Sequence, residues 1–394
     1  MQRLGTILGK STPPIKYKED SRLVLNDCLV GVEIELEDIR QDLHLRKYRD
    51  HGAWNFWKVE EDGSLRGEYA REFVLAAPLA GESLVTALLL LEDVLSTGAK
   101  QLPNCSERTS VHIHLNVSDL TTKEIRYLLG LYYAVEPLLF KYVGNNRDKN
   151  IYCLPGDIVT EDLLQFNSLG EENIKYLLNN YQKYDRKYSA LNLSSLKKYG
   201  SLEFRHKGGD WRAYSNLTWI NLILCMKRYI LEGNGTYNPD ELPAKLSVMG
   251  EDKFIDDVFG SFADGLKYPG FEKDVREGIR TSQLLLYGEN YHMALDYVRD
   301  KFQYSPEDDN KNLKAISNYL LTLSPKTRYY RLIAGMYRHV AILPNTDSSE
   351  ISTFINQNPF DAALNNIGVH GDDDDDEIDL YGEFDYPEEV DNDE

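Results

Sequence analysis

Cysteine is scarce in this chain of 394 residues, which has four copies, at positions 28, 105, 153 and 225. They are widely separated and form no C-x-x-C pair, so the sequence excludes a dense disulfide framework. We expect reduced thiols that pack as small core residues, as is usual for a protein of the cytoplasm.

Long apolar runs are also missing. Runs such as Ala87–Leu91 are far shorter than the roughly 20 residues that cross a bilayer, and the first 14 residues contain no apolar stretch typical of a secretion signal. We therefore expect a soluble, cytoplasmic protein with no membrane partner.

The chain has no basic block. Its formal net charge is −20, but residues 371–394 carry 14 acidic and no basic side chains, which leaves 50 acidic and 44 basic residues elsewhere. A body so close to charge balance argues against general binding to nucleic acid. The acidic segment has too little apolar surface to fold alone, so we predict a disordered acidic tail over residues 366–394.

A hydrophobic content of 42% is enough for a large core, and the pattern predicts an α+β fold. Repeats of 20 to 50 residues are not evident, which argues against a solenoid fold. We divide it into an extended N-terminal arm (1–22, with Pro13-Pro14), a catalytic core (23–212), a mainly helical part (213–365) and the tail. Expected strands are 29–37, 54–60, 68–76, 109–117, 188–193 and 200–206; expected helices are 81–97, 121–142, pieces within 160–183, 215–232, 252–264, 272–302, 309–323, 327–342 and 350–358.

Acidic side chains alternate with apolar ones along residues 30–37. A strand has a period of two, so Glu33, Glu35 and Glu37 share one face while the apolar residues face the core. Like charges about 4 Å apart repel by roughly 4 kcal/mol at an effective dielectric near 20. A concave row of carboxylates would therefore favour a bound metal ion, whereas a row on a solvated edge would be ordinary.

A second polar face is predicted for residues 109–117, where His112 and His114 share a side with a serine and an asparagine. Farther along, Glu203 and Arg205 share a strand face, which alone could be a simple ion pair. Asp62 lies in a D-G-S segment that alone is only a turn. Together, acids, imidazoles and a guanidinium indicate a site for divalent cations and phosphate.

In their order along the chain, these segments resemble the carboxylate-amine ligase superfamily, which includes glutamate-cysteine ligase and the glutamine synthetase fold, and most closely the putative amidoligases. The resemblance covers about residues 30–210 and is specific in the order of its motifs. Ser110 departs from it, because a glycine is expected before the histidine motif, and the stretch from Glu72 to Pro78 is longer than usual. The matching segments are G31-V-E-I-E35, D62-G-S64, R71-E-F73, H112-I-H-L-N116, R186-K-Y-S-A-L-N192 and L202-E-F-R205.

The resemblance implies a curved antiparallel sheet whose concave face, flanked by helices, binds ATP with two or three Mg²⁺ or Mn²⁺ ions. The metal ligands that it implies are Glu33, Glu35, Asp62, Glu72, His112 and Glu203. The implied catalytic residues are Arg205, His114 and Arg186, and the implied nucleotide contacts are Lys187, Asn192, Arg205 and Asn116. Arg205, with Arg186 or Lys187, would contact the transferred phosphate, and a histidine or a carboxylate would accept the amine proton.

The expected activity is that of an ATP-dependent carboxylate-amine ligase, which forms an amide or isopeptide bond through an acyl phosphate. Its carboxylate and amine substrates could belong to a small molecule, a peptide or a protein, and oligomerisation stays open. One alternative is a hydrolase in which His112 and His114 hold a transition metal with Glu35 or Asp62, although this leaves the Glu203–Arg205 pair without a role. Another is a non-catalytic interaction protein that acts through its acidic tail.

Overall fold

The computed structural model describes residues 3–10, 17–39, 49–97, 99, 101–144, 147–150, 153, 155, 189–233 and 242–287. All of them belong to one compact unit, residues 1–346. Statements below concern these described residues.

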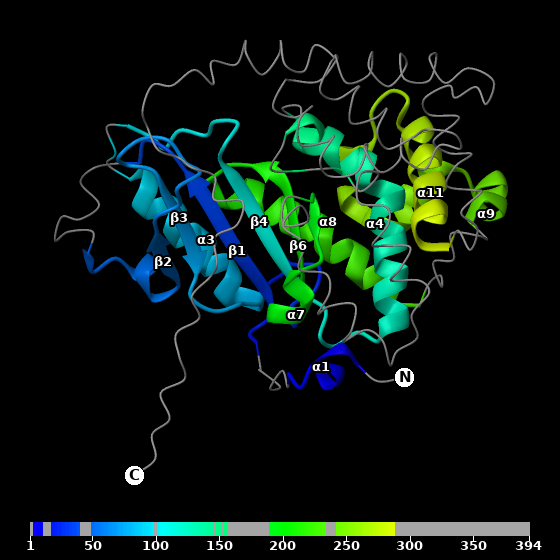
Figure 1. Cartoon of the computed structure of the whole chain (residues 1–394), viewed down its shortest axis with the longest axis horizontal. Coiled ribbons are helices and arrows are strands. Elements are labelled where there is room, and N and C mark those ends of the chain that lie inside the picture. The colour runs from blue at the N-terminus through cyan, green and yellow to red at the C-terminus, as the bar shows by residue number, and fades with distance from the viewer. Residues whose placement is uncertain are drawn as a thin grey trace, which may run out of the picture. The chain divides into compact units, whose positions relative to one another are not determined.

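A six-stranded antiparallel sheet forms the centre of the described structure, in the order β2-β3-β1-β4-β6-β5 (Figure 1). The fold is α+β, as predicted from the sequence. The strands are β1 (Val30–Leu36), β2 (Trp57–Glu60), β3 (Arg71–Leu75), β4 (Ser110–Asn116), β5 (Leu191–Asn192) and β6 (Ser201–Gly208).

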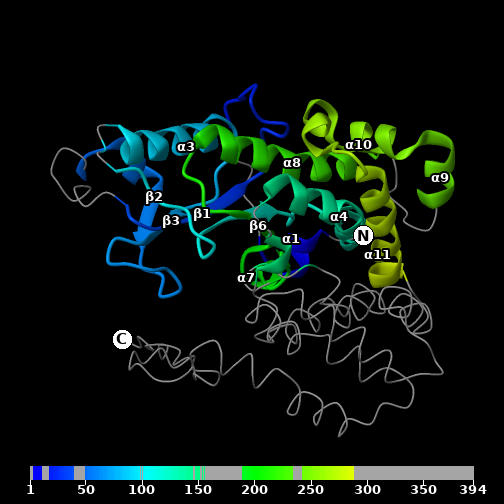
Figure 2. The same ribbon diagram turned by 90° about the horizontal axis from the view of Figure 1, so that it is seen from above.

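One face of the sheet is apolar and is covered by the helices α3 (Gly81–Ser96) and α8 (Ala213–Leu231), as Figure 2 shows. The alternating residues Val30, Val32, Ile34 and Leu36 of β1 are almost fully buried in this core. Because alternate strand residues point to opposite faces, the charged residues of β1 lie on the other side. Helix α8 lies beyond the predicted end of the core at residue 212, yet it packs on this sheet.

The helix α4 (Thr122–Val143) packs along α11 (Phe271–Tyr287), next to α10 (Glu251–Phe259) and α9 (Leu242–Met249). Thr121 and Glu124 form a reciprocal capping box at the start of α4, which satisfies backbone N–H groups of its first turn. Gly278 lets α11 approach closely, since a Cβ atom there would clash with the backbone of Ala134. None of the described helices has the length and apolarity needed to span a membrane.

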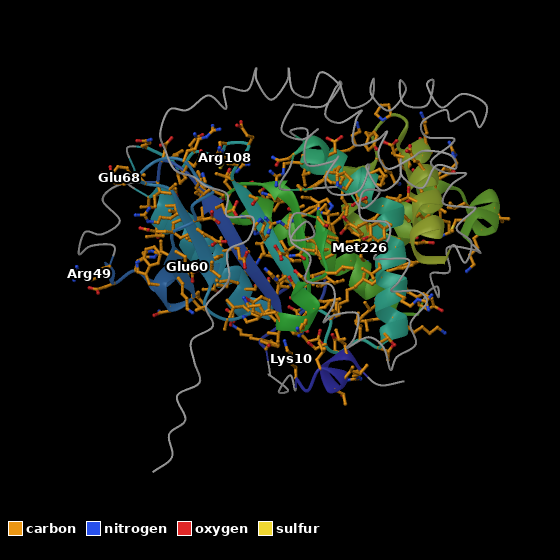
Figure 3. All side chains as sticks on the ribbon, in the orientation of Figure 1. Lys10, Arg49, Glu60, Glu68, Arg108 and Met226 are labelled. Atoms are coloured by element: carbon orange, nitrogen blue, oxygen red, sulfur yellow. The ribbon has the colours of Figure 1, made fainter. Side chains whose placement is uncertain are left out.

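The first residues do not form the extended arm that was predicted. Leu4–Ile7 form the short helix α1, and the Leu4 N–H donates to the Leu120 carbonyl at 2.8 Å. Lys10 Nζ donates to the carbonyl of Lys197 at 2.7 Å, at the end of α7 (Ser195–Tyr199) (Figure 3). Buried Leu4 and these hydrogen bonds tie the segment to the body, so the prediction of an arm is wrong here.

Most predicted strands and helices in the described regions exist, and most of their ends lie within three residues of the predicted ones. The strand predicted from residue 54 starts at Trp57 because Gly52–Asn55 form a 3-10 helix, η2. The helix predicted over 252–264 is divided at Gly260, which has a φ of 55°, and continues as the 3-10 helix η7 (Gly260–Leu266). The short helices α7 and α9 and the 3-10 helix η3 (Arg147–Lys149) were not predicted.

Several sequence predictions lie outside the described residues. They are the helices within 160–183, the part of 272–302 beyond 287, the helices at 309–323, 327–342 and 350–358, and the acidic tail. The cysteines are free thiols; three are buried as predicted, but Cys105 is exposed, so the prediction of a core residue is wrong there.

Candidate active site

Carboxylates and imidazoles converge on the sheet face opposite α3 and α8, because the strand register places them side by side. Glu35 of β1 pairs with Glu72 of β3, and Glu33 pairs with His112 of β4. On the next strand Glu203 pairs with His114. Four strands thus bring the predicted acids and histidines together, as Figure 1 lets the reader follow along β3, β1, β4 and β6.

Glu33 lies between the two histidines. Its Oε2 is 3.0 Å from His112 Nδ1, and its Oε1 is 3.1 Å from His114 Nε2. Burial acts to raise the pKa of Glu33, but the hydrogen bonds and charges of the two imidazoles outweigh it and lower that pKa. Burial lowers the pKa of His114, whereas Glu33 and Glu203 raise it, and the net change is upward. Glu33 is therefore a carboxylate that stays ionised.

Glu203 is the most highly hydrogen-bonded acid of the site, and it is only 5% exposed. Its Oε1 accepts from Arg205 Nη1 at 2.6 Å, and its Oε2 accepts from Asn192 Nδ2 at 2.7 Å and from Ser195 Oγ at 2.9 Å. Burial acts against ionisation, but Arg205 and the two imidazoles lower the pKa of Glu203. Its attraction in turn raises the pKa of Arg205 in spite of burial.

A β-bulge lies at the arginine of this pair. The β4–β6 register shifts so that Arg205 and His206 together stand opposite His112. Arg205 stays on the charged face, with Nη1 3.5 Å from His112 Nδ1, whereas His206 is fully buried on the other side, 3.0 Å from the Tyr132 hydroxyl. Arg147 holds the bulge through hydrogen bonds to the carbonyls of Arg205 and His206.

Ser110 of β4 contacts Glu35 of β1 and the Nε2 edge of the His112 ring. Its Oγ lies 2.5 Å from Glu35 Oε2 and 2.6 Å from His112 Nε2, and the residue is 3% exposed. Nearby, Gly209 allows the close approach of the chain after β6. A Cβ atom at Gly209 would clash with the Thr109 side chain and lie 2.8 Å from the Glu35 carbonyl oxygen.

Glu72 is half-buried and is surrounded by other carboxylates. Burial, and then the charges of Glu33, Glu35, Asp62 and Glu60, raise its pKa to about 8. This is the behaviour of a carboxyl group that needs a cation to ionise at neutral pH.

Two groups of three residues have ligand atoms that all lie within 4.8 Å of one another. They are Glu33, His112 and Glu203, and Glu35, Glu72 and His112. Both groups combine carboxylate oxygens with a single imidazole, and both are largely buried, which fits a small divalent cation better than a chance surface cluster.

Comparison with known families adds independent information. Residues 27–226, half of the chain, match the model of a family described as putative amidoligase enzyme. The chain belongs to this amidoligase family. The match starts just before β1 and ends within α8, so it contains every described residue of the site. A comparison with curated proteins finds no match.

The amidoligase match supports a ligase that acts on a carboxylate and an amine substrate. Five of the six predicted metal ligands belong to the two groups described above. The sixth, Asp62, is half-buried in the loop after β2, where its Oδ1 accepts from the Ser64 N–H at 2.6 Å. It is close enough to raise the pKa of Glu72 but belongs to neither group.

Two of the predicted nucleotide contacts, Asn192 and Asn116, use their side chains for hydrogen bonds within the protein. Asn192 uses its amide to hold Glu203 and its carbonyl oxygen to accept from Ser194. Asn116 turns its Oδ1 to the N–H and hydroxyl of Ser118, so it closes the end of β4 in this amidoligase. Arg186 and Lys187 lie outside the described residues. Glu37, which continues the β1 row, accepts from the Arg66 N–H at 2.9 Å.

Sequence reasoning did not select three residues that the structure places at or behind the site: Ser110, Ser195 and Arg147. Ser110 had a signal, because it shares the polar face with His112 in the strand pattern. Ser195 stands in an unpredicted short helix and Arg147 in an unpredicted 3-10 turn, and both act through contacts with distant strands. No local sequence pattern identifies such contacts.

Proposed function

We propose that this protein is an ATP-dependent carboxylate-amine ligase that uses two or three Mg²⁺ or Mn²⁺ ions and forms an amide or isopeptide bond through an acyl phosphate. The observation that carries the proposal is the convergence of Glu33, Glu35, Glu72 and Glu203 around His112, beside the Arg205 guanidinium. The family match supports the ligase class. We further propose a cytoplasmic location.

The proposed metal ligands are Glu33, His112 and Glu203 at one position and Glu35 and Glu72 at another, with Asp62 close by. Carboxylate oxygens are the donors that Mg²⁺ and Mn²⁺ prefer. The bound ions would neutralise the charge of the ATP phosphates during transfer.

Arg205 is suited to contact the transferred phosphoryl group. Its guanidinium is mostly buried, and Glu203 holds one edge of it through Nη1. A planar guanidinium matches the geometry of phosphate oxygens, and a low dielectric strengthens the attraction between them. Asn192 and Ser195 hold the far oxygen of Glu203 and so preserve the orientation of the pair.

The proposed reaction has two steps. A substrate carboxylate oxygen attacks the γ-phosphorus of ATP, the bond to the β-phosphate oxygen breaks, and ADP leaves. The amine nitrogen then attacks the acyl carbon, phosphate departs with the electron pair of the C–O bond, and the amine loses a proton. His114 suits that proton, because Glu33 and Glu203 stabilise its imidazolium form.

We also propose that the sheet has the curved form found in glutamine synthetase and glutamate-cysteine ligase, with the charged face as its concave side. The antiparallel strand order and the placement of five of the six proposed ligands on one sheet face support this. The helices α3 and α8 cover the opposite face (Figure 2), so a nucleotide would bind on the charged face.

The proposal can be tested first by binding. Isothermal titration of a non-hydrolysable ATP analogue is expected to show binding with Mg²⁺ and little without it. Glu203→Gln and Glu33→Gln should remove binding, whereas Glu68→Gln, a change of an exposed acid outside the cluster, should not. Metal-independent binding, or full binding by Glu203→Gln, would contradict the proposal.

Acyl phosphate formation can be tested with hydroxylamine as a general amine. In a screen of carboxylates, the true substrate class should give a hydroxamate together with one ADP. Hydroxamate without ADP would argue against phosphoryl activation.

The alternative hydrolase needs both histidines on one ion. His112 belongs to both metal groups, but His114 belongs to neither of the two found among the described residues. The two rings bind opposite oxygens of Glu33, which does not favour a shared zinc ion. Hydrolysis that requires metal but no ATP would support this alternative.

The interaction protein remains a second alternative, and it predicts that deletion of residues 371–394 abolishes partner binding while Glu33→Ala and Glu203→Ala have no effect.

A further inference from the structure

Ser110 lies where a single hydroxyl hydrogen must serve two neighbours. Its Oγ is within hydrogen-bond distance of Glu35 Oε2 and of His112 Nε2, and all three groups are nearly inaccessible to solvent. A hydroxyl has one hydrogen to donate and can accept with its lone pairs, and an ionised carboxylate can only accept. Ser110 therefore donates to Glu35 and accepts from His112, which requires a proton on Nε2.

The Nδ1 edge of the His112 ring faces carboxylate oxygens instead of a hydroxyl group. His112 Nδ1 is 3.0 Å from Glu33 Oε2 and 3.8 Å from Glu203 Oε1, and it is 3.5 Å from the Arg205 guanidinium. Two lone pairs cannot face each other at 3.0 Å, so either a proton or a cation must lie between Nδ1 and Glu33. With the Nε2 proton fixed by Ser110, a bound cation would meet the free lone pair of Nδ1.

We propose that Ser110 is a positioning residue that holds His112 in the Nε2–H tautomer, commits Nδ1 to the cation site with Glu33 and Glu203, and leaves the site of Glu35 and Glu72 without a nitrogen ligand. The inference rests on the proposed function only in that the cluster binds divalent cations.

The two cation sites then differ in their ligand atoms, although His112 lies beside both. The first offers one imidazole nitrogen and two carboxylates, and Mn²⁺ accepts nitrogen more readily than Mg²⁺ does. The second offers carboxylates only, a set suited to Mg²⁺. Geometry alone would allow His112 to join either group; the serine hydroxyl decides between them.

The tautomer can be measured directly on the whole wild-type protein, labelled with ¹⁵N in the histidine rings and saturated with diamagnetic Mg²⁺. The His112 signals, assigned by their loss in His112→Gln, are expected to show a protonated Nε2 and an unprotonated Nδ1. The reverse pattern, with the proton on Nδ1 and a lone pair on Nε2, would overturn the inference.

The positioning role is tested by Mn²⁺ titration followed by electron paramagnetic resonance. Loss of a partner that orients a ligand typically weakens metal binding by about 10- to 100-fold, so Ser110→Ala should weaken the tightest Mn²⁺ site by that factor. Ser110→Thr keeps the hydroxyl and should restore affinity. The matched control is Ser201→Ala, which removes a hydroxyl 3.4 Å from His114 and should leave both the affinity and the His112 signals unchanged.

His112→Gln separates the two sites. It should weaken one Mn²⁺ site and leave the second intact, whereas weakening of both sites, or unchanged binding in Ser110→Ala, would overturn the inference. These readouts need neither ATP nor substrate. If ATP analogues fail to bind while the tautomer and the Mn²⁺ results are as expected, the ligase proposal fails and the role of Ser110 stands.

Discussion

The most informative perturbation is Glu72→Gln, because this residue reports whether the acidic face needs a cation. Burial and the neighbouring carboxylates raise the pKa of Glu72 from 4.5 to about 8. In the unfolded chain Glu72 ionises near its ordinary value, whereas in the folded protein without metal it keeps its proton until much higher pH. Between these values the unfolded state is favoured progressively as the pH rises.

The size of the effect follows from linkage. A shift from 4.5 to about 8 corresponds to an upper limit of roughly 5 kcal/mol at 1.36 kcal/mol per pH unit, reached above pH 8 and absent below pH 4.5. Glu72 is only half-buried, and solvent screening reduces the expected contribution to about 2 kcal/mol. Glu72→Gln cannot ionise, so it should be more stable than the wild type by that amount at pH 8.5 and equal to it near pH 4.5.

The assay is urea unfolding of both proteins at several pH values with a chelator present. Glu68→Gln, at an exposed acid in the loop before β3, is the control and should show no such pH-dependent difference. Addition of Mg²⁺ at pH 8.5 should stabilise the wild type more than Glu72→Gln, since a cation removes the repulsion. A stability difference that is the same at pH 4.5 and pH 8.5 would refute the reasoning.

Three further predictions concern the rest of the site. Gly209→Ala should lower the free energy of unfolding by about 1–3 kcal/mol through overpacking, whereas Gly208→Ala, where a Cβ atom meets nothing within 4 Å, should have little effect; equal urea midpoints for the two would contradict this. His112→Gln should weaken Mn²⁺ binding in calorimetry much more than His114→Gln, because only His112 belongs to the metal groups; equal losses would favour a shared ion. Glu203→Ala should cost about 3–5 kcal/mol in urea unfolding, since it leaves the buried Arg205 guanidinium without its carboxylate, and a nearly neutral result would show that water replaces the pair.

Strand periodicity predicted much of the site. The alternation in β1 correctly placed Glu33 and Glu35 opposite the core, and the same reasoning correctly grouped His112 with Ser110 on one face. Glu203 and Arg205 were also predicted to share a strand face, and their side chains form the ion pair that was named as the simple interpretation of that pattern. These predictions succeeded because a period of two fixes the face of every residue once one residue is known to be buried.

The remainder depends on contacts that no local pattern contains. The bulge at Arg205 and His206 is set by how β6 meets β4, and no pattern within β6 shows that two of its residues stand opposite His112. Asn116 follows the strand alternation, yet a turn at the end of β4 takes up its side chain. Leu4 was assigned to an arm because its surroundings are polar, although it is fully buried against a segment more than a hundred residues away.

The anchoring of α1 has a practical consequence for biochemistry on this protein. Lys10 binds the carbonyl end of α7, and the same five-residue helix supplies Ser195 to Glu203 and the Tyr199 ring to the edge of His114. We therefore expect a fusion tag or a truncation at the amino terminus to alter the position of α7 and, through it, of Glu203 and His114 in the candidate site. Preparations that differ only in their amino-terminal tags should be compared for their affinity for an ATP analogue before any variant is tested.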